Sequence, residues 1–157
     1  MSRETKEELR RALAAEARLQ QRAVDALDEA VADRLGVNRT DLRCLDVLME
    51  RESATPGQLA TALGLTSGSV TTMLDRLERL GYVRRQADPD DRRKLNVVPT
   101  SKVVQAAMSL YEPIVREGAG ILSRYTAEQL EVLIDYTRRD RALQEQHAAR
   151  IRSLTTR

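Results

Sequence analysis

Two short helical segments joined by a glycine turn constrain this chain more than any other stretch. The first begins at Thr55 with an N-cap hydroxyl, a proline at the first helical position and a glutamine at the third. It ends at Gly64, because glycine readily adopts the left-handed conformation that closes a helix. The second begins at Thr66 or Ser67 and ends before Gly81. Residues 55–81 therefore predict a pair of helices connected by a tight turn.

The second of these helices has two chemically different faces. Its inner face is apolar and comprises Val70, Met73, Leu74, Leu77 and Leu80. Its outer face starts with short hydroxyl side chains and continues with charged ones, in the order Ser67, Ser69, Thr71, Thr72, Asp75, Arg76 and Arg79. Short polar groups near a helix N-terminus can approach base edges and phosphates closely. This pattern favours a DNA-reading helix-turn-helix over an ordinary packed helix corner, which is the structural alternative.

The hydrophobic period changes directly after Gly81. Residues 82–86 and 95–98 have the composition of short strands, and a turn-rich charged segment joins them. The sequence therefore predicts a two-stranded ribbon that follows the helix-turn-helix. A basic ribbon tip in this place is typical of a wing that contacts a phosphate or enters the minor groove.

The tip of the predicted wing carries both signs of charge. Arg92, Arg93 and Lys94 follow three aspartates, of which Asp91 is the last. We expect Asp91 to hold the base of the wing while Arg92 or Arg93 extends outward. The alternative is a solvated turn whose acidic residues pair with the arginines at positions 84 and 85.

Long helical segments flank this block on both sides. A capping box at Thr5 opens a helix that ends before Gly36, and a second helix begins near Asn38. Downstream, Thr100 and Thr126 each open one further long helix. We therefore predict a mainly α fold with a small β wing, namely a winged helix-turn-helix with long N- and C-terminal helices.

Composition argues against several other classes of protein. Cys44 is the only cysteine and His147 the only histidine, too few for a zinc site or for a nucleophilic triad. We therefore expect no metal, no cofactor and no enzymatic activity. The longest uncharged stretch, residues 53–74, contains eight Ser and Thr, which is poor bilayer composition. The charged N-terminus lacks an apolar signal segment, so we expect a cytoplasmic protein without a membrane partner.

Taken together, these motifs resemble the MarR family of bacterial transcription regulators. The resemblance extends over nearly the whole chain, because the flanking helices match in number and order. It rests on Gln58-Leu59-Ala60, Gly64-Leu65-Thr66, Val70-Thr71-Thr72-Met73-Leu74-Asp75-Arg76-Leu77-Glu78, Gly81-Tyr82-Val83-Arg84-Arg85 and Asp88-Pro89-Asp90-Asp91-Arg92-Arg93.

The resemblance implies a homodimer that binds double-stranded DNA at a palindromic operator. Residues 1–36 and 101–157 would form the dimerisation helices, and residues 37–100 the winged helix-turn-helix domain. Two recognition helices would enter successive major grooves, and a small, often phenolic, effector would release the repressor from DNA. Tyr111 is the candidate effector contact, because its helix would border the usual cleft.

Three departures from the family pattern stand out. Val103 replaces the glycine that usually follows the wing, and Asp41 occupies a position where members often carry glutamine. The chain also lacks Phe and Trp, so only tyrosines can supply rings to a ligand cavity.

The candidate DNA contacts follow from the outer face of the second helix and from the wing tip. Arg76 is the best candidate for a bidentate guanine contact, because its planar fork matches the guanine major-groove edge. The full set of candidates is Ser67, Ser69, Thr71, Thr72, Arg76, Arg92, Arg93 and Lys94.

Two other functional hypotheses use the same fold. A thiol-sensing regulator would respond through Cys44, although its place beside Leu45 and four residues before Leu48 favours a core position. A winged-helix module that binds a protein instead of DNA is the other alternative. DNA binding that is weak or insensitive to salt would mark that module.

Overall fold

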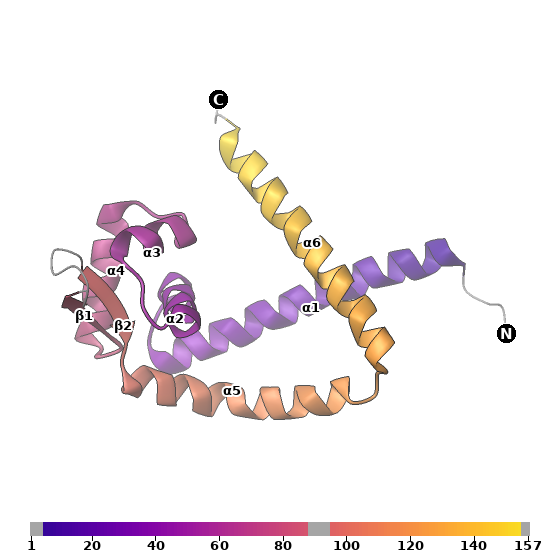
Figure 1. The fold of residues 1–157 in the computed structure, drawn as a ribbon, viewed down its shortest axis with the longest axis horizontal. Coiled ribbons are helices and arrows are strands. Elements are labelled where there is room, and N and C mark those ends of the chain that lie inside the picture. Colours follow the sequence, from indigo (N-terminus) through magenta and orange to yellow (C-terminus); the bar gives the residue numbers. More distant parts are fainter. Residues whose placement is uncertain (1–4, 88–94, 155–157) are drawn as a thin grey trace. The chain divides into compact units, whose positions relative to one another are not determined.

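The computed structural model describes residues 5–87 and 95–154 (Figure 1). These residues form six helices and one two-stranded sheet, and the chain divides into two compact units, Met1–Leu110 and Tyr111–Arg157. In chain order the elements are α1 (Lys6–Leu35), α2 (Arg39–Arg51), α3 (Pro56–Leu63), α4 (Ser67–Arg79), β1 (Val83–Ala87), β2 (Leu95–Pro99), α5 (Ser101–Leu122) and α6 (Ala127–Ser153). The predicted mainly α fold with a small β wing is confirmed.

The helix ends lie where local signals predicted them. Thr55 accepts a bond from the Gln58 amide at 3.2 Å, and its own amide donates to the Gln58 side chain at 2.8 Å. Reciprocal capping boxes of the same kind open α1, α2 and α6. Gly36 and Gly64 end α1 and α3 in the left-handed region, with φ of 69° and 67°. These local bonds explain why the predicted boundaries are accurate.

The core of the first unit forms where α2, α3, α4 and the sheet meet. Val70, Met73, Leu74 and Leu77 on α4 are buried, as predicted for its inner face, while Leu80 is half-buried at the helix end. From the other elements the same core takes Cys44, Leu45, Leu48, Ala54, Leu59, Leu63, Val83, Val97 and Val103. One apolar cluster therefore holds the whole helix-turn-helix in place.

The sheet contains the predicted ribbon and one additional pairing. Strands β1 and β2 run antiparallel, with Val83 opposite Pro99 and Ala87 opposite Leu95. Ala54, just before α3, also pairs with Val97: its amide donates at 3.1 Å, and it accepts from the Val97 amide at 2.8 Å. This bridge ties the start of α3 to β2, and a single residue gives no periodic signal that would predict it.

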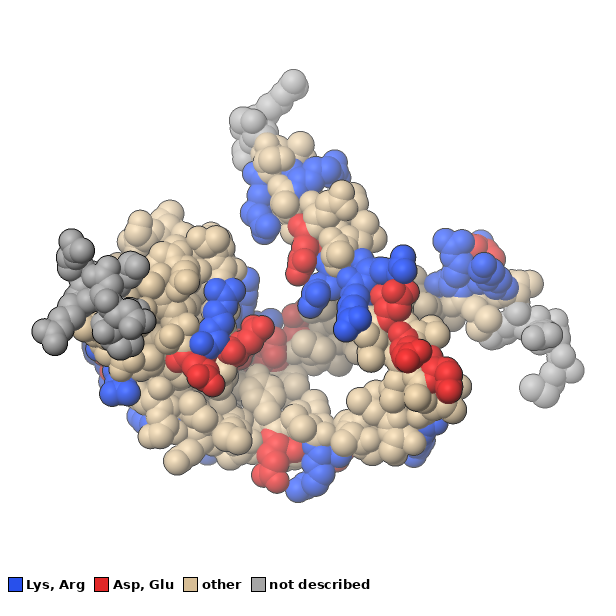
Figure 2. Space-filling view, in the orientation of Figure 1, with Lys and Arg blue, Asp and Glu red and all other residues tan. Residues whose placement is uncertain are grey.

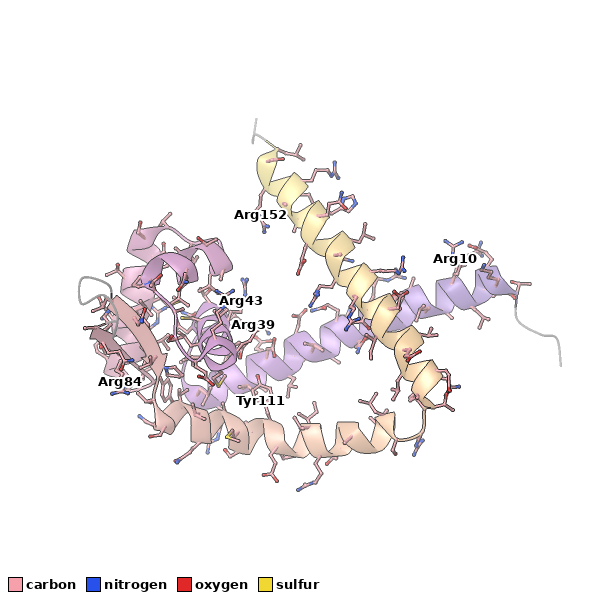
Figure 3. The ribbon with its side chains drawn as sticks, in the orientation of Figure 1. Arg10, Arg39, Arg43, Arg84, Tyr111 and Arg152 are labelled. Carbon is pink, nitrogen blue, oxygen red and sulfur yellow. The ribbon has the colours of Figure 1, made fainter. Side chains whose placement is uncertain are left out.

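The long terminal helices are far less buried. Helix α1 buries residues only in its last two turns, at Val31, Ala32 and Leu35. Near this end it is joined to α2 by Arg39 (Figure 3), whose Nη2 lies 3.1 Å from Asp25 Oδ1. Helix α6 buries no residue in the single chain. Within residues 5–87 and 95–154, no helix is long and apolar enough to cross a membrane.

Candidate nucleic-acid interface

The turn between α3 and α4 sets the direction of the second helix. The Leu65 amide donates to the Ala60 carbonyl at 3.0 Å, and the Gly64 amide donates to Thr61 at 3.4 Å. Leu59 and Leu63 are buried, so α3 packs firmly against the core and supports this turn. Thr66 then caps α4, with its hydroxyl 3.3 Å from the Ser69 amide. The capped N-terminus of α4 is thereby held in a fixed place beside α3.

The four hydroxyl residues predicted as DNA contacts all lie on the exposed face of α4. Ser67, Ser69, Thr71 and Thr72 are each solvent-exposed. The Thr71 hydroxyl donates to the Ser67 carbonyl at 3.0 Å, and the Thr72 hydroxyl donates to the Gly68 carbonyl at 3.2 Å. Because these hydroxyl protons are used within the helix, the two threonines offer an acceptor oxygen and a methyl group to a ligand.

The surface around this face carries little charge. No charged residue occurs between Ser53 and Leu74, a stretch that includes all of α3 and the first two turns of α4. In the view of Figure 2, the surface over α3 is accordingly almost free of blue and red. The N-terminal part of α4 therefore presents short polar groups and a helix N-terminus, whose partial positive charge favours an anion such as phosphate.

Arg76 occupies a different environment from that of the hydroxyl residues. Its Nε donates to Asp41 Oδ2 at 2.7 Å, and its Nη2 donates to Asp41 Oδ1 at 2.5 Å. This hydrogen bonding raises the pKa of Arg76, so the guanidinium remains a cation. Arg76 lies on the predicted outer face of α4. However, two N–H donors of its guanidinium, which was expected to bind guanine, are already bonded to the Asp41 carboxylate.

Asp41 is the residue of this region that the sequence analysis did not assign to the site. It is fully buried, whereas the side chain of Arg76 is 38% exposed. Its amide donates to the Asn38 side chain at 2.9 Å, which completes the cap of α2. A buried carboxylate requires a partner, and Arg76 supplies it. Asp41 and Arg76 stand 35 positions apart, so no local pattern in the sequence links them. The only signal was that position 41 carries aspartate where family members often carry glutamine.

A hollow of about 460 Å³ opens beside this ion pair. It lies between the start of α2 and the N-terminal half of α4. Its polar lining comes from Asn38, Thr40, Ser69, Thr72 and Arg76. The hollow thus joins the arginine to the hydroxyl face of α4.

The base of the wing is fixed to α4 by a second arginine. The Nη2 of Arg85 on β1 lies 2.6 Å from Asp75 Oδ1, and its Nη1 pairs with Glu78. The hydrogen bond to Asp75 is the largest cause of the raised pKa of Arg85. Its neighbour Arg84 is exposed on β1 (Figure 3). Asp91, Arg92, Arg93 and Lys94 lie outside the described residues, so their roles stay predictions.

Side chains around Tyr82 hold the other end of α4. The Tyr82 hydroxyl donates to the Leu35 carbonyl in the last turn of α1 at 2.8 Å. The Thr100 hydroxyl donates to the Gly81 carbonyl at 2.7 Å, and Lys102 Nζ donates to the Leu80 carbonyl at 2.6 Å. The end of α1 and the start of α5 are therefore bonded to the end of α4.

The two remaining candidates belong to other helices, Cys44 to α2 and Tyr111 to α5. Cys44 is fully buried, as expected for a core residue, and burial followed by the nearby Asp41 charge raises its pKa to about 12. A thiol in this state provides very little thiolate at neutral pH. Tyr111 lies in α5 and is half-buried, and its role as an effector contact stays a prediction.

Comparisons with known proteins identify the same fold and the same class. The sequence model of the MarR family matches residues 37–95. The chain is 35% identical to the HTH-type transcriptional regulator YcgE of Bacillus subtilis over 124 residues, which are 79% of this chain and 80% of that protein.

Two solved structures have the same fold. The transcriptional regulator Tm0710 from Thermotoga maritima matches with a TM-score of 0.62 at 24% identity, over 88% of this chain and 98% of that one. A mutant of MarR from E. coli complexed with operator DNA matches with a TM-score of 0.55 at 21% identity, over 82% and 92%.

Proposed function

The chain belongs to the MarR family of DNA-binding transcriptional regulators, and from this premise we propose that it reads a palindromic operator as a homodimer. The observation that carries the proposal is the exposed hydroxyl face of α4, which stands opposite a fully packed inner face. A recognition helix enters the major groove with its N-terminal residues at the base edges. Hydroxyl oxygens accept hydrogen bonds from adenine and cytosine amino groups there, and threonine methyls contact the thymine methyl.

We propose separate roles for the helix and for the wing. Ser67, Ser69, Thr71 and Thr72 contact base edges or the adjacent phosphates. Arg92, Arg93 and Lys94 contact phosphates or the minor groove, where positive charge adds affinity without reading the major-groove code. The helix therefore supplies most of the sequence preference, and the wing supplies most of the salt dependence.

The homodimer is supported by apolar side chains that one chain leaves uncovered. On α6, Val132 is 68% exposed and Leu143 is 50% exposed, and on α5 Ile121 is 62% exposed. Val132 and Leu133 also line a hollow of about 370 Å³ together with Tyr125. Exposed apolar patches on a folded chain mark a contact surface. A second copy of the chain places two recognition helices on one operator, which makes the operator a palindrome.

Repression with release by a small effector completes the proposal. Tyr111 is the candidate effector contact, and it can be tested with a panel of phenolic acids. We expect an effective compound to release operator DNA from the wild-type protein. Substitution of Tyr111 by Ala should raise the concentration required. An unchanged concentration for the variant would remove Tyr111 from the site.

Selection of bound DNA from a random pool, repeated at two salt concentrations, tests the DNA-reading proposal. We expect a palindromic motif whose affinity falls steeply with salt, because phosphate contacts release counterions. Its half-sites should lie about one helical turn apart, as expected for a symmetric dimer. Absence of any enriched motif at low salt would contradict the proposal and favour the protein-binding alternative.

A matched pair of threonine variants tests whether α4 does the reading. Thr72→Val removes an exposed hydroxyl that donates to a helix carbonyl on α4. Thr61→Val removes an exposed hydroxyl in the same kind of bond, at 3.1 Å to Gly57, but on α3. We expect only Thr72→Val to change the base preference of the selected motif. Equal changes in both variants would contradict the assignment of α4 as the reading helix.

A further inference from the structure

We infer that Asp41 is a positioning residue for DNA recognition: it holds Arg76 so that the outer edge of the guanidinium is presented to a guanine in the major groove. This inference rests on the proposed function and adds a specificity determinant to it. Asp41 itself contacts no base, because it is fully buried. It acts by fixing the orientation of a side chain on the reading helix.

The bond pattern leaves one edge of Arg76 available. Asp41 takes the Nε proton and one Nη2 proton, through bonds of 2.7 and 2.5 Å. An arginine carries five N–H donors, so two on Nη1 and one on Nη2 remain. In the described part of the chain, no acceptor is bonded to Nη1. The Nη1–Nη2 edge is the one that can form two parallel bonds to guanine O6 and N7.

Burial makes the carboxylate a rigid support for this edge. Asp41 is in the first turn of α2, is fully buried and also accepts a bond from the Asn38 backbone amide at 3.4 Å, so the carboxylate has little freedom to move. Two parallel bonds fix both the plane and the rotation of the guanidinium. A surface arginine without such a support must lose rotamer freedom when it binds, and it can also swing to a phosphate. The supported arginine is already ordered before binding.

The position of Arg76 places it among the proposed base contacts. Ser69, Thr72 and Arg76 follow one another at intervals of three and four residues, so they share one face of α4. All three line the hollow of about 460 Å³ that opens between α2 and α4. The side chain of Arg76 keeps 38% of its surface exposed although its carboxylate partner is buried. The ion pair is therefore buried on the Asp41 side and solvent-exposed on the side of the hydroxyl residues.

Asp41→Asn tests the inference, because it keeps the size of the side chain and removes its charge. An amide can accept only through its oxygen, and its NH2 group faces an arginine donor, so the fork loses one of its two bonds. We expect the preference for guanine at one base pair of each half-site to fall roughly tenfold, within the range for a bidentate contact. Preference at the other positions should stay as in the wild type.

Asn38→Ala is the matched control. This variant removes the bond that the Asn38 side chain accepts from the Asp41 amide and weakens the cap of α2, but it leaves the bonds between Asp41 and Arg76. We expect it to lower the unfolding temperature while the guanine preference stays unchanged. Arg76→Lys provides a second variant if Asp41→Asn unfolds. It keeps a cation beside the buried carboxylate, and it should relax the same base pair because the planar fork is gone.

The measurement is selection from a random DNA pool for each variant, with thermal unfolding recorded in parallel. A loss of guanine preference at the same base pair in Asp41→Asn and Arg76→Lys, but not in Asn38→Ala, supports the inference. The inference is overturned if the wild-type protein selects a motif and Asp41→Asn shows the same base preference at every position. That result leaves the proposed function intact. Failure of the wild-type protein to select any motif contradicts the proposed function itself.

Discussion

The helices and strands of residues 39–99 bury most of their apolar side chains within one chain, whereas α6 fully buries none of its own. Leu45, Leu48 and Leu77 in the first region are completely buried. In the second region, Val132 and Ile151 are 68% and 59% exposed. The two regions nevertheless have equally good local signals for helix formation, since Thr55 and Thr126 form the same capping box. The difference between them therefore lies in tertiary burial and not in helix propensity.

This contrast separates the part of the fold that one chain completes from the part that we propose a second copy completes. The exposed hydroxyl face of α4, which we propose reads DNA, is supported by a core that one chain completes. The terminal helices retain exposed apolar surface, which a second copy would cover in the proposed homodimer.

Substitution within the core should have the largest effect. Leu77→Ala removes a completely buried side chain, and we expect a loss of about 2–5 kcal/mol in the free energy of unfolding. The loss should be independent of protein concentration in urea titrations. The comparison variant is Leu143→Ala, whose side chain is 50% exposed in the single chain. Its effect should depend on protein concentration. Concentration-independent losses in both variants would show that one chain alone also completes the burial around Leu143.

A charge placed on the exposed apolar face should disrupt assembly and weaken DNA binding. We expect Val132→Asp to shift the protein toward a monomer in sedimentation equilibrium. Operator affinity should fall roughly 100-fold, because linked half-site contacts lose their effective concentration. The neighbouring exchange Glu131→Asp keeps the charge of an exposed position and should change neither property. A Val132→Asp variant that remains a dimer would place the interface elsewhere.

The same glycine-to-alanine exchange should have opposite effects on stability in the turn after α3 and in the long helix α5. Gly64 has a φ of 67°, so a Cβ there is strained, and Gly64→Ala should cost about 1–2 kcal/mol. Gly118 lies inside α5, where an added Cβ meets no atom within 4 Å. Gly118→Ala should therefore stabilise the protein by about 0.5–1 kcal/mol. Thermal unfolding measures both, and a destabilising Gly118→Ala would indicate that a partner chain packs on this glycine.

Modification of Cys44 should have the smallest effect under native conditions. Burial raises its pKa from the usual 9.0 to about 12, so the folded protein should react very slowly with thiol reagents at neutral pH. Complete labelling in urea is the control. Peroxide should leave operator binding unchanged, and a full peroxide response would revive the thiol-sensing hypothesis.

The raised pKa also has a consequence for stability. Because the folded state holds the thiol proton more tightly, Cys44 favours folding below pH 9.0. This contribution is lost as the pH rises toward 12.

Most of the fold could be predicted because its signals are local. The boundaries at Thr5, Thr55 and Gly64 depend on residues within four positions of one another. The wing strands were predicted to within about one residue from the change of period after Gly81. The bonds of Arg76 could not be predicted, because its partner Asp41 belongs to another helix and ordinarily would be read as a solvent-exposed cap residue. The bridge between Ala54 and Val97 likewise depends on the tertiary fold alone.

The bonds around Tyr82 determine how α4 can move. Tyr82 attaches it to the end of α1, while Thr100 and Lys102 attach it to the start of α5. We therefore expect α4 to turn together with the end of α1 and the start of α5. In the proposed homodimer, the angle between the long helices of the two copies would set the distance between the two copies of α4. A few degrees of change in that angle would mismatch the half-site spacing, so DNA release would require no rearrangement of the reading face itself.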